Sequence, residues 1–259
     1  MAQGQHWWRN VEVRREPTNE ELNMTANLAV SYGVKGFQYF WYSSYDKHPV
    51  SCQYGTGIVN TSGVLIDQNY YGQSGKANTI KNIVDRVANK WGPTLMGFDI
   101  GRSHSYIYTK EAIINGNFPG EGKVQFLRDV KTYKPILPYT GGIENLQHET
   151  NPEILSQRYL QVSVFNTPNS YETVEENRYF MITNKRCSPF APLQNSGGGK
   201  RFIKVRFDTS PIWEFGMFDY RTFNLIDVED NHVVATFLRN GDPGDYVDVD
   251  LGWFEPGEG

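Results

Sequence analysis

The stretch that decides the fold is PTNEELNMTANLAVSYGVKGFQYFWY, residues 17–42. Thr18 and Glu21 have the spacing of a capping box, which predicts that a helix begins here. Apolar residues then recur every three or four positions, and Gly33 stands where a left-handed cap would end the helix. The run from Gly36 to Phe40 is aromatic and uncharged, which predicts a strand covered on both faces. Helix and strand together make half of a βαβ unit.

The neighbouring sequence extends this α/β pattern in both directions. Upstream, only Met1 to Trp8 could form an earlier strand. Downstream, a second helix with an apolar stripe is predicted for residues 76–91, and Gly92 with Pro93 is expected to end it. The stripe is formed by Ile80, Ile83, Val84 and Val87. This order is typical of the last two βα units of a (β/α)8 barrel, so residues 1–95 are expected to be the end of a larger TIM barrel.

From residue 157 onward the sequence changes to an all-β pattern. Short runs separated by Asn, Gly, Pro or Asp predict an antiparallel β-sandwich over residues 157–259. The runs are YLQVSVF, RYFMITN, RFIKVRF, FNLIDVED, HVVATFLR and DYVDVDL. Residues 96–156 are expected to be a connecting region with short strands, in which PYTGGIENLQHETNPE forms a polar loop or linker. The apolar helix and strand of residues 1–42 should be loosely attached, self-associating or docked on the sandwich.

Several of these runs resemble a known family. The pattern P-T-x-x-E-L-x-M-x-x-x-L-A-x-x-Y-G-x-K-G-x-x-Y-F, residues 17–40, and G-x-V-x-x-x-G, residues 57–63, resemble the end of the barrel in glycoside hydrolases of the β-galactosidase-like superfamily. They are closest to the family 42-like barrels and their bacterial relatives. Tyr159–Arg186 resembles the first hairpin of the β-sandwich that follows such barrels, and Leu251–Gly259 resembles its last strands. The resemblance spans roughly two thirds of the chain and implies truncation at both ends.

The resemblance implies that the parent protein is a carbohydrate-active enzyme, in particular a glycoside hydrolase. Such enzymes use two carboxylates at the scissile bond, which in barrels lie at C-terminal strand ends. The family's acid/base belongs to a barrel strand outside this chain, and MAQGQHWW offers Gln and His where the nucleophile is usual. Glu12 and Asp46 are the remaining catalytic candidates, although a solvated loop carboxylate is the favoured interpretation of each. We therefore expect the chain alone to be inactive.

The ends of the two predicted barrel strands carry candidate substrate-binding residues. Gln5 and His6 would bond sugar hydroxyls while Trp7 stacks on the ring; the alternative is that the tryptophans only cap the barrel rim. Trp41, followed by Tyr42, would form the floor of the subsite that holds the sugar, and core packing is the alternative for Trp41. The aromatic content of 14% fits a sugar-handling protein, and it equally fits packing in a β-rich fold.

Composition and motifs narrow the other classes of function. A net charge of −4 argues against a nucleic-acid partner, and no apolar run is long enough to span a bilayer. His104, His148 and His232 lack metal-ligand spacing, so neither a metal nor a cofactor is predicted. The expected partner is an oligo- or polysaccharide.

Two further hypotheses stay open at this point. One is a non-catalytic carbohydrate-binding or structural β-sandwich module, and the other is a parent barrel that binds glycan without its nucleophile. The sequence leaves the sugar, the linkage, the oligomeric state and the compartment open, with a secreted or periplasmic parent as one option.

Overall fold

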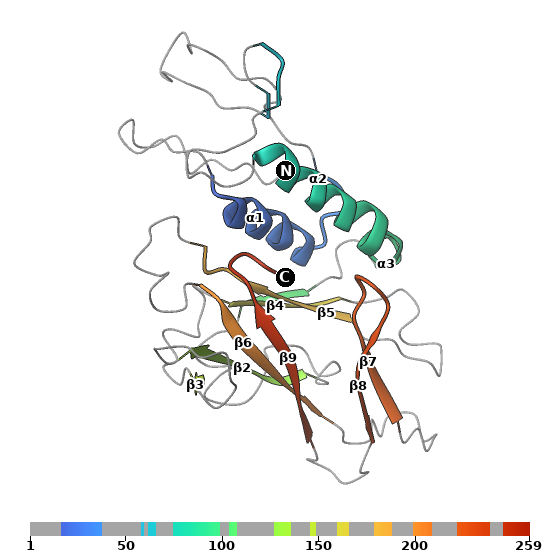
Figure 1. Cartoon of the computed structure of the whole chain (residues 1–259). Coiled ribbons are helices and arrows are strands. Elements are labelled where there is room, and N and C mark those ends of the chain that lie inside the picture. Colours follow the sequence, from blue (N-terminus) through green and yellow to red (C-terminus); the bar gives the residue numbers. More distant parts are fainter. Residues whose placement is uncertain are drawn as a thin grey trace.

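The fold is mixed, with few helices and several antiparallel sheets. The computed structural model describes residues 17–37, 58–59, 62–65, 75–98, 104–107, 127–135, 146–148, 160–165, 179–187, 199–208, 222–238 and 246–259. Within these ranges the helices lie together on one side of the strands, and the C-terminal end of the chain lies between α1 and the strands (Figure 1).

Helix α1 (Asn19–Ser31) confirms the first predicted helix. The Thr18 hydroxyl accepts a hydrogen bond from the Glu21 amide at 3.2 Å, and the Glu21 carboxylate accepts one from the Thr18 amide at 3.0 Å. These two bonds close the predicted capping box. Gly33 follows with a φ of 80°, a left-handed geometry that a residue without Cβ adopts readily. Gly36 and Phe37 have no regular structure, and the rest of the predicted strand lies outside the described residues.

The second helical segment runs further than predicted. Helix α2 (Lys76–Asp85) passes into a π-helical segment, η3 (Arg86–Trp91), and then into α3 (Gly92–Met96). The expectation that Gly92 and Pro93 end the helix is wrong. Pro93 lies at the start of α3, directly after the π-helical segment.

The apolar stripe of this segment is narrower than the sequence suggested. Ile83 and Val87 are buried as predicted, and the buried line continues through Trp91. Val84 is exposed instead, because it lies about 100° around the helix from Ile83.

All of the predicted C-terminal runs form strands. They are β4 (Leu160–Phe165), β5 (Tyr179–Asn184), β6 (Arg201–Asp208), β7 (Thr222–Ile226), β8 (Val233–Leu238) and β9 (Tyr246–Phe254). Three strands precede them, namely β1 (His104–Ile107), β2 (Leu127–Pro135) and β3 (Leu146–His148). Strand β3 falls within the run that was expected to be a polar loop or linker, so that expectation is wrong there.

The described strands pair in three antiparallel sheets, with the orders β1-β4-β5, β3-β2-β6-β9 and β7-β8. The first two sheets share one hydrophobic core, to which the β7–β8 hairpin adds partly buried residues. The buried members of this core are Val130, Leu160, Val162, Ile182, Ile203, Val205, Phe207 and Val249. Strand β1 pairs with β4, and β2 pairs with β6. Each of these two sheets therefore includes a strand that precedes residue 157, where the all-β region was expected to begin.

The helices cover the other face of the β1-β4-β5 sheet. In β4, Leu160 and Val162 face the core that the two sheets share, whereas Phe165 belongs to a second core with the helices. The buried members of this second core are Ala26, Val30, Ile83, Val87, Trp91, Leu95, Phe98 and Phe165. Helix α1 therefore packs on the β1-β4-β5 sheet through this second core. Every strand pair in the described part of the chain is antiparallel, so these residues give no support to the predicted barrel units.

Candidate functional site

The residues that the sequence predicted to be functional lie outside the described ranges. They are Gln5, His6, Trp7, Glu12, Trp41, Tyr42 and Asp46. Their roles stay predictions. The described strands nevertheless offer two groups of polar and aromatic side chains, one on a sheet face and one at a hairpin tip.

The first group lies on the face of the β3-β2-β6-β9 sheet that turns away from the core, which we call the outer face. In β6, Ile203 and Val205 enter the core, so Phe202, Lys204 and Arg206 point to the opposite side. The strand register then decides which residues of β2 and β9 stand beside them. The outer face is therefore a direct consequence of the period-two pattern in RFIKVRF.

An aromatic row crosses the outer face. The register aligns Tyr133 of β2 with Phe202 of β6, and Phe202 with Trp253 of β9. The ammonium group of Lys204 lies 5.7 Å from the ring centroid of Tyr133 and 5.8 Å from that of Phe202. The Lys200 ammonium lies 5.5 Å from the Trp253 ring. These distances are within the range of cation–π attraction, which holds the cations over the row.

Two cross-strand ion pairs stand next to the aromatic row. Arg206 makes a bidentate contact with Asp248, Nε to Oδ1 at 2.7 Å and Nη2 to Oδ2 at 2.8 Å. Lys204 Nζ lies 2.9 Å from Asp250 Oδ1. The hydrogen bond from Arg206 lowers the pKa of Asp248, and the hydrogen bond to Asp250 raises the pKa of Lys204. Asp248 and Lys204 therefore stay charged at neutral pH, and the two pairs present both donors and acceptors.

Tyr246 extends this surface at the start of β9. The Arg206 guanidinium carbon lies 3.7 Å from its ring centroid, and 55% of the Tyr246 surface remains exposed. The guanidinium fixes the ring, so little conformational freedom is lost when a ligand stacks on it. An accessible flat ring beside charged hydrogen-bonding pairs can hold a sugar through its C–H face and its hydroxyls.

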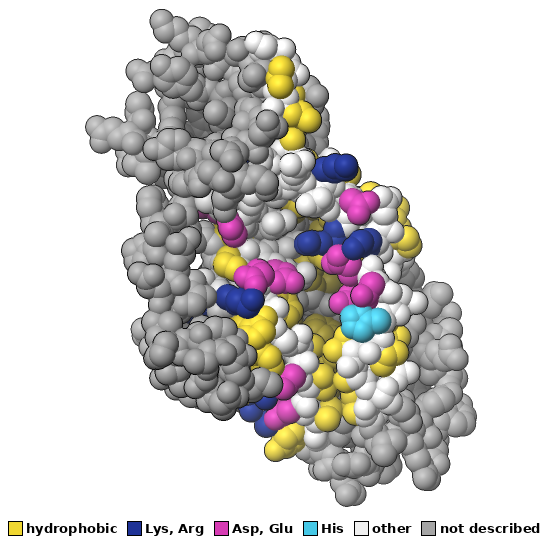
Figure 2. Space-filling view, in the orientation of Figure 1, with side chains coloured by type: hydrophobic (Ala, Val, Ile, Leu, Met, Phe, Trp, Pro, Cys, Tyr) yellow, Lys and Arg dark blue, Asp and Glu magenta, His cyan; other side chains and the backbone are white. Residues whose placement is uncertain are grey.

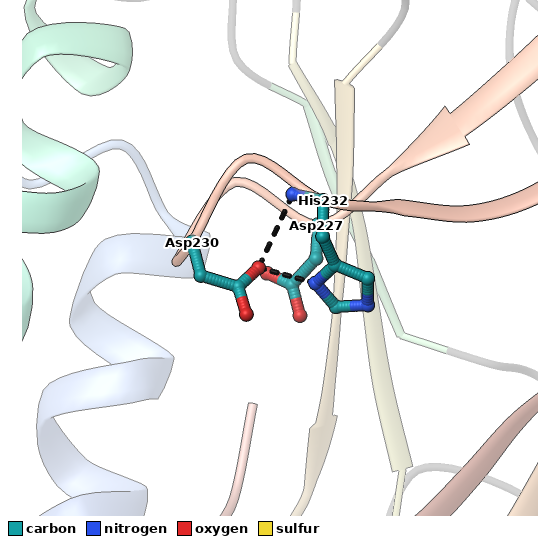
Figure 3. A group of neighbouring side chains, drawn as sticks. All are labelled: Asp227, Asp230 and His232. Atoms are coloured by element: carbon teal, nitrogen blue, oxygen red, sulfur yellow. Dashed lines mark hydrogen bonds and ion pairs between the residues drawn. The ribbon is translucent and has the colours of Figure 1, made fainter.

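The second group is the tip of the β7–β8 hairpin (Figure 3), where Asp227, Asp230 and His232 bring their ligand atoms within 4.8 Å of one another. His232 Nδ1 contacts Asp230 Oδ1, and the His232 amide donates to the same oxygen at 3.3 Å. The side-chain bond raises the pKa of His232 and lowers that of Asp230. All three residues are exposed, as expected for a solvated hairpin tip. No metal-ligand spacing was predicted from the sequence because the histidines were compared only with one another. The Asp-x-x-Asp-x-His pattern of residues 227–232 combines one histidine with two aspartates.

Ion pairs connect this hairpin tip to the helices. Glu229 accepts a hydrogen bond from Lys90 Nζ at 2.8 Å, and Arg86 Nε lies 3.4 Å from its other carboxylate oxygen. Figure 2 shows acidic and basic side chains gathered between the helices and the strands, with hydrophobic side chains visible between β9 and the hairpin. None of the described helices is long and apolar enough to cross a membrane.

Comparisons with known proteins do not assign the chain to a family. No protein-family model matches the chain, and no curated protein or solved structure matches it either. Function is therefore inferred from the outer face and from the sequence motifs alone.

Proposed function

We propose that this chain is part of a carbohydrate-active protein and that its sandwich binds a glycan on the outer face. The observation that carries the proposal is the exposed Tyr246 ring under the Arg206 guanidinium, in line with the Lys204–Asp250 pair and Trp253. The ring would pack on a pyranose, and the neighbouring ion pairs would bond its hydroxyls. Arg206 pairs with Asp248 and Lys204 with Asp250, so these four charges compensate one another, which favours a neutral glycan over a charged one.

The sequence motifs extend the proposal to the parent protein. In this view residues 1–95 are the end of a glycoside hydrolase barrel, and its catalytic carboxylates lie outside the chain. Gln5, His6, Trp7, Trp41 and Tyr42 would then be barrel-rim residues that contact substrate. The chain by itself would bind sugar without hydrolysing it.

Calorimetric titration of the chain with neutral oligosaccharides and soluble polysaccharides tests the binding proposal. Tyr246→Ala should weaken binding about tenfold, equivalent to about 1.4 kcal/mol. Tyr32→Ala is the matched control, because Tyr32 is 57% exposed but belongs to the C-terminal end of α1. Failure of every neutral glycan to bind, or an equal affinity of the Tyr246→Ala variant and the wild type, would reject the outer face as the site.

The enzyme part of the proposal needs a separate measurement. Release of the aryl group from aryl glycosides should be undetectable with this chain alone. Turnover that disappears in Glu12→Gln or Asp46→Asn would show instead that the chain holds its own catalytic carboxylate, and the view of an inactive piece would be wrong.

A further inference from the structure

The segment Glu255–Gly259, which we call the tail, is inserted between helix α1 and strand β5. The Gly257 amide donates to the Asn184 carbonyl at 2.9 Å, and the Asn184 amide donates to the Glu258 carbonyl at 2.7 Å. On the other side, Asn27 Nδ2 of α1 donates to the Gly257 carbonyl at 2.8 Å. The tail backbone is thus bonded to the helix and to the strand at the same residue.

Asn184 anchors the tail with its side chain as well. Its Nδ2 donates to the Gly199 carbonyl at 2.7 Å and lies 3.2 Å from the Glu255 carbonyl and 3.3 Å from that of Phe254. Its Oδ1 accepts from the Arg186 amide at 3.3 Å. The residue is fully buried, so each of these bonds is formed in a site without competing water.

The groove that holds the tail is matched to glycine. Gly257 has a φ of 79°, and a Cβ at this position would lie 2.1 Å from the Glu20 carbonyl oxygen of α1. A Cβ on Gly259 would lie 2.9 Å from the Thr183 hydroxyl oxygen and 2.7 Å from Met181 Cε. Since the Glu20 carbonyl belongs to a helix backbone, the clash at Gly257 cannot be relieved by a side-chain rotation.

Polar contacts dominate this side of the helix–sheet contact. Asn27 and Ser31 of α1 are buried there, and Gln161 Nε2 of β4 donates to the Ser31 hydroxyl at 2.8 Å. The tail sequence, Glu-Pro-Gly-Glu-Gly, contributes little apolar surface. Directional hydrogen bonds therefore specify the contact, whereas hydrophobic burial contributes less to its strength than in a core.

The opposite side of the helical layer is held differently. Phe98 stacks on Phe165 of β4 with ring centroids 4.7 Å apart, and it contacts Tyr179 of β5 at 5.0 Å. This apolar contact can hold the helices after the polar side has separated. Opening of helix α1 with the tail then exposes Ala26 and Val30 of the second core but leaves the sandwich folded, as local openings in native proteins do.

We infer that the tail is a releasable latch and that the groove between α1 and β5 is its receptor, which also accepts the same segment supplied as a separate peptide. The inference does not depend on glycan binding. It concerns an interaction surface, and its ligand is a segment of this chain recognised through backbone groups and the absence of a Cβ at Gly257.

The experiment uses the full chain with Gly257→Ala and a fluorescent peptide of sequence EPGEG. Hydrogen exchange of the α1 amides should become roughly tenfold faster in the variant, while the β6 amides keep their protection. The peptide should bind the variant, whose groove is vacated, and should not bind the wild type. A peptide with alanine in place of Gly257 should bind neither. Gly36→Ala is the matched control, because no atom lies within 4 Å of its added Cβ.

The inference is overturned if α1 exchanges at the wild-type rate in Gly257→Ala, or if the peptide binds wild type and variant equally. If Gly257→Ala does not fold, exchange in the wild type decides. A latch requires the amides of Gly257 and α1 to exchange together and faster than those of β6. Exchange of all these amides at a single rate would show that tail, helix and sandwich open only by global unfolding.

Discussion

The rings of Phe202 and Trp253 meet edge to face on the outer face, with centroids 5.5 Å apart and planes at 81°. This contact depends on a β-bulge. Asp250 pairs with Lys204, but the next pair is Gly252 with Ile203, so Leu251 is an extra residue in β9. If Leu251 were paired regularly with Ile203, Trp253 would stand opposite Arg201 and face away from Phe202, because successive residues of a strand alternate between faces.

Gly252 makes the bulge possible, and its replacement should be costly. Its φ is 99°, and no atom lies within 4 Å of an added Cβ. Gly252→Ala should therefore destabilise the protein by about 1–2 kcal/mol through backbone strain alone. Urea unfolding measures the loss, and acrylamide quenching reports any change in tryptophan exposure. Gly36→Ala, with the same open surroundings and no positive φ, should lose nothing; an equal loss in both variants would refute the backbone explanation.

Asn184→Ala should be among the most destabilising single substitutions in the described part of the chain. It removes a buried amide that bonds the Gly199 carbonyl at 2.7 Å and leaves that carbonyl without its donor. A loss of about 2–4 kcal/mol in the free energy of unfolding is expected, since more than one buried bond is broken. Asn224→Ala breaks an exposed bond from the Thr236 hydroxyl and should cost about 0.5 kcal/mol or less. Similar losses in the two variants would contradict this ranking.

Glu258 should contribute more to the free energy of unfolding at acidic than at neutral pH. Burial raises the pKa of this carboxyl and outweighs the hydrogen bond from the Glu255 amide, which lowers it. The folded state therefore binds the proton more tightly than the unfolded state. Stability increases as the pH falls through the folded pKa, and the gain is complete below the unfolded pKa.

Glu258→Gln tests this linkage. The amide oxygen of glutamine can still accept from the Glu255 amide, which lies 2.6 Å from the carboxylate in the wild type. The variant should be more stable than the wild type at pH 7, and the two should converge towards pH 4. Glu255→Gln is the control and should show a small loss at pH 7, because it removes the exposed ion pair with Lys200. A constant difference between Glu258→Gln and the wild type at every pH would disprove the assignment.

We expect His232, at the tip of the β7–β8 hairpin, to have a pKa above that of an ordinary histidine. The hydrogen bond that the His232 ring donates to the Asp230 carboxylate raises the pKa of His232 above its ordinary value, so the imidazolium persists to higher pH. Any stabilisation from the pair is lost as the pH rises through the raised pKa of His232, and it is lost again as the pH falls through the lowered pKa of Asp230. NMR titration of the imidazole should show a lower pKa in Asp230→Asn than in the wild type. An unchanged midpoint would mean that the two side chains do not interact in solution.

Local sequence determined the elements of this fold whose signals are short in range. The capping box of Thr18 and Glu21 and the left-handed Gly33 define α1, because both act within one or two helical turns. Alternation in RFIKVRF likewise determined which side chains of β6 enter the core. The sequence could not predict that the helical segment continues through Gly92 and Pro93. The π-helical segment before them alters the regular α-helical repeat on which that prediction was based.

Tertiary structure decided what these elements do together. Pairing of β1 and β2 with strands far along the chain, and the meeting of Asn27 with Gly257, depend on contacts between segments distant in sequence. The extra Leu251 in β9 is invisible without the partner strand, although it decides the face on which Trp253 stands. A single sequence encodes local backbone preferences directly, but it encodes long-range pairing only through complementary surfaces. Those surfaces become defined when the chain has folded.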